Sequence, residues 1–264
     1  MIRSTLVVPC YNEAARLDDA ALLSLVDDGT HVATQMGTNL GITLLLVDDG
    51  SRDQTPARLA ALAQRAPARI QTVSLPSNRG KAEAVRQGLR AALASGADVV
   101  GYFDADLSTP VSEVRRLLDI IDHDPDAAAV IGARISLLGN DIQRSHLRHY
   151  LGRVFATVAS LVLRARVYDT QCGAKLFRRS AALDAALAQP FLSRWAFDVE
   201  LLGRMLIGDA SVAAIGPSQF REVPLLHWRD VPGSKLNARA MAGALKDLAE
   251  IAADLARRRR AARA

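Results

Sequence analysis

Two aspartates, Asp104 and Asp106, flank Ala105 directly after the apolar run VVGYF at 99–103. Carboxylates two positions apart at the end of a strand can bind a hard divalent cation together with the phosphates that the cation carries. A simpler interpretation is a turn aspartate and a helix-capping aspartate ahead of Pro110, because the D-x-D pattern is short. Metal binding at Asp104 and Asp106, with Mg²⁺ or Mn²⁺ as cofactor, is therefore a hypothesis that other residues must support.

Three more polar segments carry groups that can bind a nucleotide. Asp48 and Asp49 follow the apolar run 42–47, and a carboxylate there can accept a hydrogen bond from a base N–H. The segment 78–81, NRGK, places cations at a glycine turn that opens a helix, which favours a diphosphate. The segment 9–13, PCYNE, follows the apolar run 5–8. Each segment alone is also typical of an ordinary turn, so the segments together indicate a nucleotide site more specifically than any one of them does.

The elements that would position these segments alternate between strand and helix. Apolar runs predict strands at 5–8, 42–47, 99–103 and 128–132, and an alternating pattern predicts one at 70–75. Helices are predicted at 13–26, 80–95 and 111–122, with another from Pro56 that Thr55 caps. Runs that are apolar throughout, separated by helices, indicate a parallel sheet covered on both faces. Ligands bind such sheets outside the carboxyl ends of the strands, so 9–13, 48–51 and 104–108 should surround one crevice.

The second half of the sequence is less regular. It predicts helices at 144–167, 197–206 and 237–260, a strand and turn at 167–177 and an edge strand at 221–226. The helix at 237–260 has one apolar stripe and runs into the basic end RRRRAARA. We therefore expect an α/β fold with a Rossmann-like, mostly parallel sheet, helices on both faces and a C-terminal helical extension. The expected division is a catalytic domain at 1–235, with halves 1–135 and 136–235, and an amphipathic helix with a basic tail at 236–264.

Composition excludes several classes of protein. The 264 residues are 50% hydrophobic and 23% charged, which fits neither a disordered chain nor a membrane bundle. Two cysteines, Cys10 and Cys172, are too few for a disulfide scaffold or a four-cysteine zinc site and suit a reducing cytoplasm. The longest apolar run, 154–163, is half of the roughly 20 residues that a membrane span needs. With no signal-peptide pattern at the start, the expected location is cytoplasmic.

The four segments VPCYNE, VDDGS, NRGKAEAV and DADLS, in this order, resemble the family 2 glycosyltransferases. The resemblance implies an inverting enzyme of the GT-A fold that uses a nucleotide-sugar donor. By this resemblance Pro9, Tyr11 and Glu13 line the nucleoside pocket and one of Asp48 and Asp49 binds the base. Lys81 lies near the nucleotide, and the metal–diphosphate is bracketed by Asp104, Ala105 and Asp106.

The second half narrows the resemblance to one branch of this family. The segments DTQCGAKLF at 169–177 and RWAFDVELL at 194–202, with Arg144-Ser145 and VPGSK at 231–235, resemble the dolichyl-phosphate β-glucosyltransferases and polyprenyl-phosphate glycosyltransferases. Ala174 departs from the aromatic residue usual in this branch, and the sequence lacks the terminal membrane helix of many relatives. The Q-x-x-R-W signature of processive synthases is absent, which argues against a polymerase.

The resemblance also implies roles for residues of the second half. Asp106, Asp198 and Arg144 are the expected catalytic residues, and the expected acceptor-binding residues are Arg134, Arg144, Ser145, Gln171, Trp195 and Lys235. A hydroxyl acceptor would need a general base, for which Asp198 and Glu200 are the candidates. A phosphate acceptor is already ionised and needs cations instead. Because some of these residues also fit ordinary structural roles, such as Trp195 in a core, both interpretations stay open.

The first hypothesis is transfer of a hexose from a nucleotide sugar, UDP-glucose before GDP-mannose, to a polyprenyl or dolichyl phosphate at the cytoplasmic membrane face. The apolar run inside 148–166 is flanked by arginines, which predicts a helix lying on an anionic membrane, although core packing is an alternative. The basic tail would add to peripheral attachment. Two other hypotheses are a soluble family 2 enzyme with a hydroxyl acceptor and a non-catalytic membrane-surface protein. No nucleic-acid partner is expected.

Overall fold

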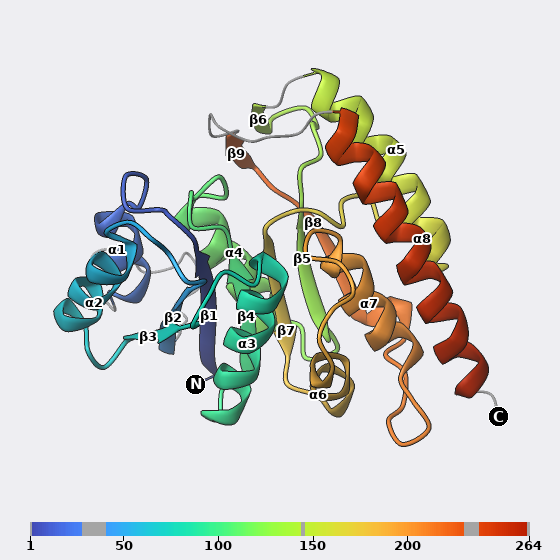
Figure 1. Cartoon of the computed structure of the whole chain (residues 1–264), viewed down its shortest axis with the longest axis horizontal. Coiled ribbons are helices and arrows are strands. Elements are labelled where there is room, and N and C mark those ends of the chain that lie inside the picture. Colours follow the sequence, from blue (N-terminus) through green and yellow to red (C-terminus); the bar gives the residue numbers. More distant parts are fainter. Residues whose placement is uncertain (1, 28–40, 144–145, 230–237, 263–264) are drawn as a thin grey trace.

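The computed structural model describes residues 2–27, 41–143, 146–229 and 238–262. These residues form a seven-stranded sheet in the order β3-β2-β1-β4-β7-β5-β8 and a separate two-stranded sheet, β6-β9 (Figure 1). The strands are β1 Arg3–Cys10, β2 Gly41–Asp48, β3 Ile70–Ser74, β4 Val99–Phe103, β5 Ala129–Ala133, β6 Asp141–Gln143, β7 Ala174–Arg178, β8 Phe220–Pro224 and β9 His227–Arg229.

Strand β7 interrupts the parallel arrangement of the large sheet. It pairs antiparallel with β4 on one side and with β5 on the other, whereas the pairs β1–β2, β1–β4, β2–β3 and β5–β8 are parallel. The expected mostly parallel α/β sheet is confirmed, and β8 is the edge strand that the sequence predicted. Because β7 runs against its neighbours, the residues that precede it lie at the carboxyl end of β4.

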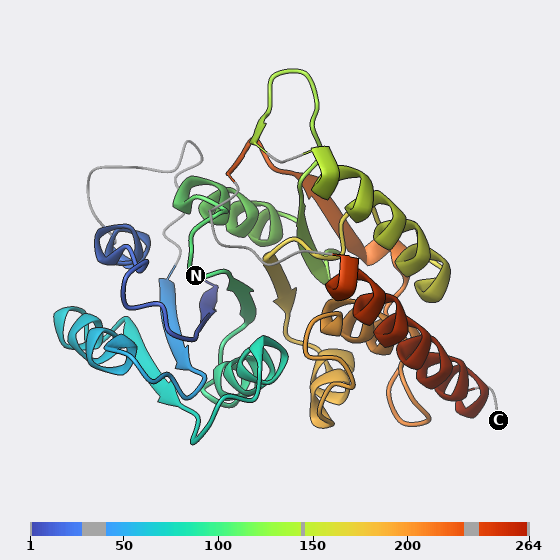
Figure 2. The same ribbon diagram turned by 45° about the horizontal axis from the view of Figure 1, so that its top comes forward.

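Helices cover both faces of the large sheet (Figures 1 and 2). One buried cluster joins α3, α5, α6, α7 and α8 to the sheet, and a second joins α1, α2 and α4 to the other face. The helices are α1 Asp19–Val26, α2 Thr55–Arg65, α3 Lys81–Ala94, α4 Val111–His123, α5 His146–Leu163, α6 Ala181–Ala188, α7 Phe197–Ile207 and α8 Ala238–Ala261, with a short 3₁₀ turn at Pro217–Gln219.

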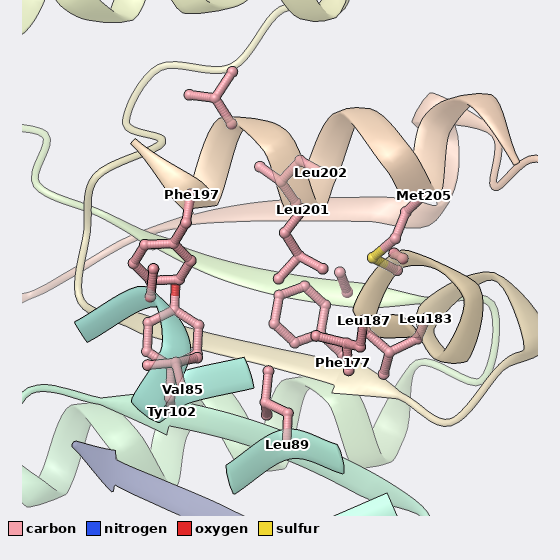
Figure 3. Close-up of a cluster of buried hydrophobic side chains, with 14 of the residues drawn as sticks. Val85, Leu89, Tyr102, Phe177, Leu183, Leu187, Phe197, Leu201, Leu202 and Met205 are labelled. Atoms are coloured by element: carbon pink, nitrogen blue, oxygen red, sulfur yellow. The ribbon is translucent and has the colours of Figure 1, made fainter. Parts of the chain in front are cut away.

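Figure 3 shows where the first cluster meets the sheet. The rings of Tyr102 on β4 and Phe197 on α7 lie 5.8 Å apart, and Phe177 on β7 fills the space beside Leu201. The hydroxyl of Tyr102 points toward the start of α7, where it donates to Asp198. The core therefore fixes the position of α7 relative to the end of β4.

Helix α8 belongs to the same core. Its inner face contributes Ala244, Leu248, Ile251 and Leu255 to the first cluster. A Cβ on Gly203 of α7 would lie only 2.4 Å from a methyl carbon of Leu255, so glycine is what lets the two helices approach closely. No helix among the described residues combines the length and the apolar character needed to cross a membrane.

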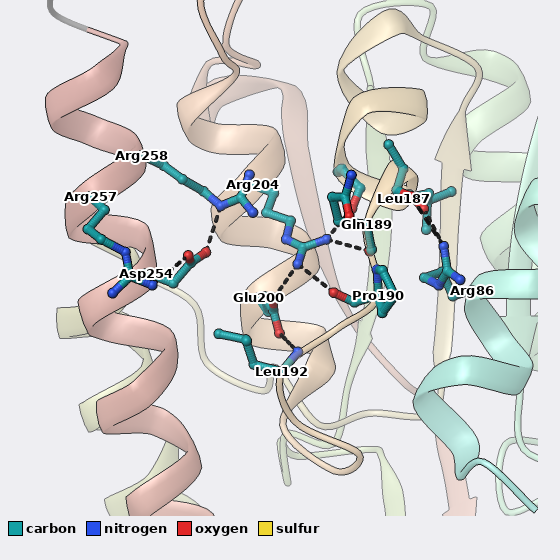
Figure 4. A network of polar contacts seen from close by, with 12 residues as sticks. Arg86, Leu187, Gln189, Pro190, Leu192, Glu200, Arg204, Asp254, Arg257 and Arg258 are labelled. Carbon is teal, nitrogen blue, oxygen red and sulfur yellow. Dashed lines mark hydrogen bonds and ion pairs between the residues drawn. The ribbon is translucent and has the colours of Figure 1, made fainter.

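The arginines at 257–259, near the end of α8, have partners within the fold. Arg257 and Arg258 both bind Asp254, at 3.1 and 2.6 Å, as Figure 4 shows. Arg259 donates to the carbonyl oxygen of Val162, at 2.8 Å, and to that of Leu163 in the last turn of α5. A cation at a helix C-terminus satisfies carbonyls that the helix leaves unpaired. Part of the predicted basic tail thus belongs to α8 and joins it to α5.

Two of the predicted helix starts are wrong. The helix predicted from Glu13 begins at Asp19, because the Asp18 side chain caps the backbone N–H of Ala21 and residues 13–17 form a turn. The next helix begins at Thr55 rather than Pro56, and Gln54 occupies its N-cap without a side-chain bond. The Thr55 hydroxyl instead accepts the N–H of Glu13, at 2.8 Å.

The second half also differs from its prediction in detail. Helix α5 ends at Leu163, where Arg164 adopts a left-handed φ of 56°, so the helix does not reach 167. Only Ala174–Arg178 of the predicted strand and turn pairs as a strand. Helix α6 and the β6–β9 pair were not predicted, because the first is an alanine-rich stretch without clear polar spacing and the strands have three residues each.

Candidate active site

The carboxyl ends of β1, β2 and β4 meet at one edge of the large sheet, as the topology predicted. A pocket of about 380 Å³ opens there. Its walls come from the loops after these three strands and from the start of α3, and the lining residues are Pro9, Cys10, Tyr11, Glu13, Asp49, Asn78, Gly80, Lys81, Ala84, Asp104, Ala105 and Asp106. Of the predicted donor-binding residues, all but Asp48 line this pocket.

The loop after β1 is held by the loop after β2. The backbone N–H of Asn12 donates to the Ser51 hydroxyl at 3.0 Å, and the Asn12 side chain accepts the N–H of Arg52 at 2.9 Å. The N–H of Ala14 donates to Asp53, and Thr55 accepts from Glu13 as described above. Because these bonds tie residues 12–14 to the neighbouring loop, the chain turns here before α1 begins.

Asp48 and Asp49 are both buried, and both bind backbone N–H groups. Asp48 accepts the N–H of Ser51 at 3.1 Å, a turn contact next to its own strand. The two carboxylate oxygens of Asp49 accept the N–H groups of Arg79 and Gly80, each at 2.7 Å. Asp49 therefore fixes the turn that opens α3, and binding of a nucleotide base by either aspartate stays a prediction.

The first residue of α3 reaches the aspartate pair. Lys81 forms an ion pair with Asp104 across the pocket. Burial disfavours the ammonium form, but the carboxylates of Asp104 and Asp198 outweigh it and raise the pKa of Lys81. Lys81 is thus a permanent cation at the place where a diphosphate would meet Asp104.

Gly173 leaves room for Asp104. A Cβ on this glycine would lie 2.0 Å from a carboxylate oxygen of Asp104, so no other residue fits without moving that side chain. The N–H of Asp104 donates to the carbonyl of Gly173 at 3.0 Å.

Asp106 accepts the N–H of Ser108 at 3.0 Å, and the Ser108 carbonyl in turn accepts the backbone N–H of Arg229 of β9.

Glu13 completes the acidic side of the pocket. One of its oxygens binds Arg16 at 2.7 Å, while Oε2 is buried and has no hydrogen-bond partner among the described residues. Burial raises the pKa of Glu13, an effect that Arg16 opposes and that Asp106 and Asp104 reinforce. A buried acceptor without a partner at the wall of a pocket suits a ligand hydroxyl or N–H.

Asp198, a predicted catalytic residue, lies at the start of α7 in a buried polar cluster. Its Oδ1 accepts a hydrogen bond from the Tyr102 hydroxyl and pairs with the ammonium of Lys175 at 2.7 Å. Lys175 is buried and also donates to the carbonyl of Cys172 at 2.5 Å. Burial and the adjacent Asp198 raise the pKa of Tyr102 well above its usual value, so the phenol stays protonated and donates.

Glu200, the other candidate base, is fully buried two residues further along α7. It pairs with Arg204 at 2.5 Å and accepts the N–H of Leu192 at 2.8 Å (Figure 4). Burial raises the pKa of Glu200 although Arg204 opposes this shift. Arg204 also donates to the carbonyls of Ala186, Gln189 and Pro190, so this pair holds the segment before α7 in place.

The predicted acceptor-binding residues are only partly brought together. Arg134 forms a two-pronged ion pair with Asp169, at 2.7 and 2.8 Å, and lies over the Trp228 ring. Gln171 has a buried amide nitrogen without a partner in the described part of the chain. Trp195 is 41% exposed and packs edge-on against Phe155. Arg144, Ser145 and Lys235 lie outside the described residues.

Sequence reasoning missed three residues of this region. Lys175 and Tyr102 hold Asp198, and Arg194 donates to the turn at 78–80. The available signal for Lys175 was a lysine inside the apolar strand AKLF, which requires a buried partner. Burial raises the pKa of the Cys10 and Cys172 thiols to about 12, which favours their protonated form.

Solved structures share the fold. Glucosyl-3-phosphoglycerate synthase from Mycobacterium tuberculosis, solved with Mn²⁺, UDP and glucosyl-3-phosphoglycerate, superposes with a TM-score of 0.67 at 18% identity, covering 96% of this chain and 80% of that one. Mannosyl-3-phosphoglycerate synthase from Rubrobacter xylanophilus gives 0.64 at 15% identity, with 96% and 73% covered. The fold is therefore the GT-A fold of glycosyltransferases.

Sequence comparison gives the family. The model of glycosyl transferase family 2 matches residues 5–184, and the chain belongs to this family, so it is a glycosyltransferase. The chain is 30% identical over 241 residues to a protein of Dictyostelium discoideum named dolichyl-phosphate beta-glucosyltransferase, covering 88% of this chain and 68% of that protein. The Saccharomyces cerevisiae protein of the same name is 32% identical over 250 residues, covering 88% and 68%.

Proposed function

We propose that the enzyme transfers glucose from UDP-glucose to a polyprenyl phosphate with inversion at the anomeric carbon. The relatives named above support both the sugar and the class of acceptor. The observation that carries the proposal is the state of the two candidate bases. Asp198 is held by Lys175 and Tyr102, and Glu200 by Arg204 and a backbone N–H. A carboxylate held in an ion pair is a poor base for a hydroxyl, whereas a phosphate acceptor needs no proton removed, and this contrast supports the phosphate.

The donor would occupy the pocket at the ends of β1, β2 and β4. Tyr11, 40% exposed, offers a ring face to the base, and the unpaired oxygen of Glu13 offers an acceptor to a nucleoside hydroxyl. Lys81 and the N-terminus of α3 face the diphosphate side. Because the loops are fixed by side-chain bonds to backbone groups, this pocket is largely formed before the donor binds.

The residues also fit a divalent cation, provided that the donor supplies part of its ligand shell. The described residues contain no group of three or more acidic, histidine or cysteine side chains close enough to hold a metal alone. Asp104 and Asp106 offer two carboxylates, and Mg²⁺ and Mn²⁺ sites commonly combine one or two carboxylates with substrate phosphates. When bound, such a cation neutralises charge that develops on the leaving diphosphate. Lys81, which is paired with Asp104, would place a second positive charge beside the diphosphate.

The acceptor would approach from the side of α7. A phosphomonoester with a second pKa of about 6 is largely dianionic at neutral pH, so it can attack the anomeric carbon directly. Asp198 then acts by orientation rather than proton transfer, since Lys175 and Tyr102 keep its carboxylate in one place. Trp195, half-exposed three residues earlier, is suited to pack against the sugar or the prenyl chain.

A pair of acceptors matched in chain length tests this proposal. The enzyme should glucosylate a polyprenyl phosphate, and the corresponding polyprenol should give on the order of 1% of that rate or less, because Asp198 and Glu200 would not activate its hydroxyl. For the phosphate, kcat/KM should rise with pH near the second acceptor pKa of about 6. Asp198→Asn should keep this rise even if it slows turnover. A better rate with the alcohol, together with loss of the rise in Asp198→Asn, would instead make Asp198 a base.

Contact with the membrane is the second part of the proposal, and the surface for it lies on α5. Tyr150, Val154 and Leu161 are 70%, 55% and 73% exposed and recur at helical spacing, so they form one apolar stripe. The opposite face of α5, with Phe155, Ala159 and Leu163, is buried in the core. Core packing and membrane contact are therefore compatible, because each uses a different face of the helix.

The surroundings of this stripe suit a lipid interface. Arg153 and Arg164 are exposed beside it, as expected for a helix that lies among headgroups. The loop that leads into β6 projects from the end of the molecule where α5 begins (Figures 1 and 2), and its Leu137 and Leu138 are 51% and 105% exposed. Because the arginines at 257–259 have partners inside the fold, α5 and not the tail should carry the attachment.

Vesicle binding of charged variants tests the α5 surface. Val154→Glu with Leu161→Glu should weaken binding to vesicles of anionic and neutral phospholipid by at least about tenfold, because it removes two apolar side chains and adds negative charge. Ala57→Glu with Ala60→Glu adds the same charge to exposed positions on α2 and should bind as the unaltered protein does. If both double variants lose vesicle binding equally, the cause is net charge. If the α5 variant loses none, α5 does not contact the membrane.

A further inference from the structure

Arg194 is an exposed residue with a fixed side chain. It lies in the segment before α7, yet its guanidinium donates across to the turn that opens α3. Nε donates to the carbonyl of Arg79 at 2.9 Å, and a terminal nitrogen donates to the side-chain oxygen of Asn78 at 2.8 Å and to its carbonyl at 3.3 Å. One arginine thus uses its planar fork to hold both residues that precede Gly80.

The same turn is held from its other side by Asp49. Its carboxylate accepts the backbone N–H groups of Arg79 and Gly80, so the peptide groups of the turn lie between an anion and a cation. Gly80 has a φ of 95°, and a Cβ there would lie 2.5 Å from Nε of Arg194. Glycine is therefore required for the backbone angle and for the approach of Arg194.

The position of this turn determines where the ammonium group of Lys81 lies in the donor pocket. Lys81 follows Gly80 directly and pairs with Asp104, and Asn78, Gly80 and Lys81 all line the pocket. A shift of the turn would move the start of α3 and Lys81 relative to the aspartate pair. Arg194 does not itself line the donor pocket, so any influence on the donor passes through the turn.

At its other end, the segment of Arg194 is continuous with the proposed acceptor side. The Ser193 hydroxyl accepts the N–H groups of Trp195 and Ala196 and donates to Asp247 of α8 at 2.5 Å. Trp195 packs on Phe155 of α5, and α7 with Asp198 begins two residues later. The residue on one side of Arg194, Ser193, is thus tied to α8, and the residue on the other side, Trp195, packs on α5.

We propose that Arg194 is a positioning residue that links the donor-side turn at 78–80 to the acceptor-side segment at 193–198. The link rests on the proposed function, since it assigns a nucleoside diphosphate to the pocket. When the donor occupies the pocket and fixes the turn, Arg194 transmits that constraint to Trp195 and Asp198. Without the donor the same contact limits how far the turn can move, so the start of α3 is already aligned.

Titration of the whole chain with UDP and Mn²⁺ tests the first half of this proposal. Arg194→Ala should raise the UDP dissociation constant about tenfold, because the turn loses the charged guanidinium whose hydrogen bonds orient it. Arg194→Lys keeps the charge without the fork and should recover only part of the affinity. Arg90→Ala, an exposed arginine further along α3, is the matched control and should bind UDP unchanged.

The fluorescence emission of Trp195 tests the second half of the proposal, the link to the segment at 193–198. All proteins in this experiment carry Trp228→Phe, so that Trp195 is the one remaining tryptophan. Saturating UDP should change this emission when Arg194 is present and leave it unchanged in Arg194→Ala, a response that loss of stability alone does not predict. Equal UDP affinity and equal emission change in both proteins would overturn the proposal. If the unaltered protein binds GDP and not UDP, the donor assignment is wrong and the same titrations with GDP decide the role of Arg194. Binding of neither nucleotide would refute the proposed function and with it this inference.

Discussion

Asp106→Asn should reduce glucosyl transfer on the order of a hundred- to a thousandfold, as expected when charge that faces a metal–diphosphate is removed. Asp104→Asn should also be severe but less so, because Lys81 already neutralises part of the charge of Asp104. Both side chains lie on the loop after β4 and are only partly buried, so neither change removes core packing. The melting temperature should therefore change by no more than a few degrees, as for most surface substitutions.

Steady-state transfer and Mn²⁺ binding should be measured on the same preparations. In the unaltered protein Mn²⁺ should bind much more tightly when UDP is present, since Asp104 and Asp106 would supply two carboxylates and the nucleotide further ligands. Asp106→Asn should abolish this enhancement. Asp126→Asn, on an exposed turn before β5, removes the same charge away from the pocket and should behave as the unaltered enzyme. Near-normal turnover of Asp106→Asn in EDTA would refute metal-assisted departure of the nucleotide.

The first half of the fold was predictable because its signals are local. The buried strands β1, β2 and β4 are each largely a continuous apolar run, and the parallel topology brings the polar residues that follow them to one edge. Helix starts were less predictable. The sequence around Glu13 favours a helix, but residues 12–14 are bonded to the loop at 51–55, and the helix begins only after Asp18.

The second half depends on contacts between residues far apart in sequence. Arg134 could be recognised as a cation near the site, but nothing local shows that Asp169 binds both prongs of its guanidinium. The arginines at 257–259 were predicted as part of a basic tail, although Asp254 and the end of α5 bind them. In the same way, Asp198 was predicted as a catalytic residue, whereas its partners Lys175 and Tyr102 come from two different strands and meet it only once the sheet is assembled.

Lys175→Met should destabilise the protein by about 3–5 kcal/mol, the usual cost of leaving one member of a buried ion pair without its partner. Lys175 is 1% exposed and Asp198 4%, so water cannot replace the lost ammonium. The Tyr102 hydroxyl would still donate to Asp198, but a neutral donor compensates a buried carboxylate poorly. Methionine has a similar length and no charge, so the substitution tests charge rather than volume.

Chemical denaturation of Lys175→Met, Asp198→Asn and the double variant separates the pair from its parts. The double variant should be more stable than Lys175→Met, because it no longer buries an unpaired charge, and the resulting coupling free energy should be at least about 1 kcal/mol. Lys246→Met on α8 is the control for the loss of a lysine. Lys246 is exposed and makes a long ion pair with Glu250, at 3.8 Å, so this change should alter the free energy of unfolding by less than about 0.5 kcal/mol.

The stability of Lys175→Met also bears on the acceptor. If this variant is as stable as the unaltered protein and the coupling free energy is close to zero, the ammonium does not hold Asp198, and the carboxylate is available as a base. A large coupling free energy instead means that taking up a proton at Asp198 would break a buried ion pair. General-base catalysis by Asp198 would then carry that cost in every turnover, whereas an ionised phosphate acceptor avoids it.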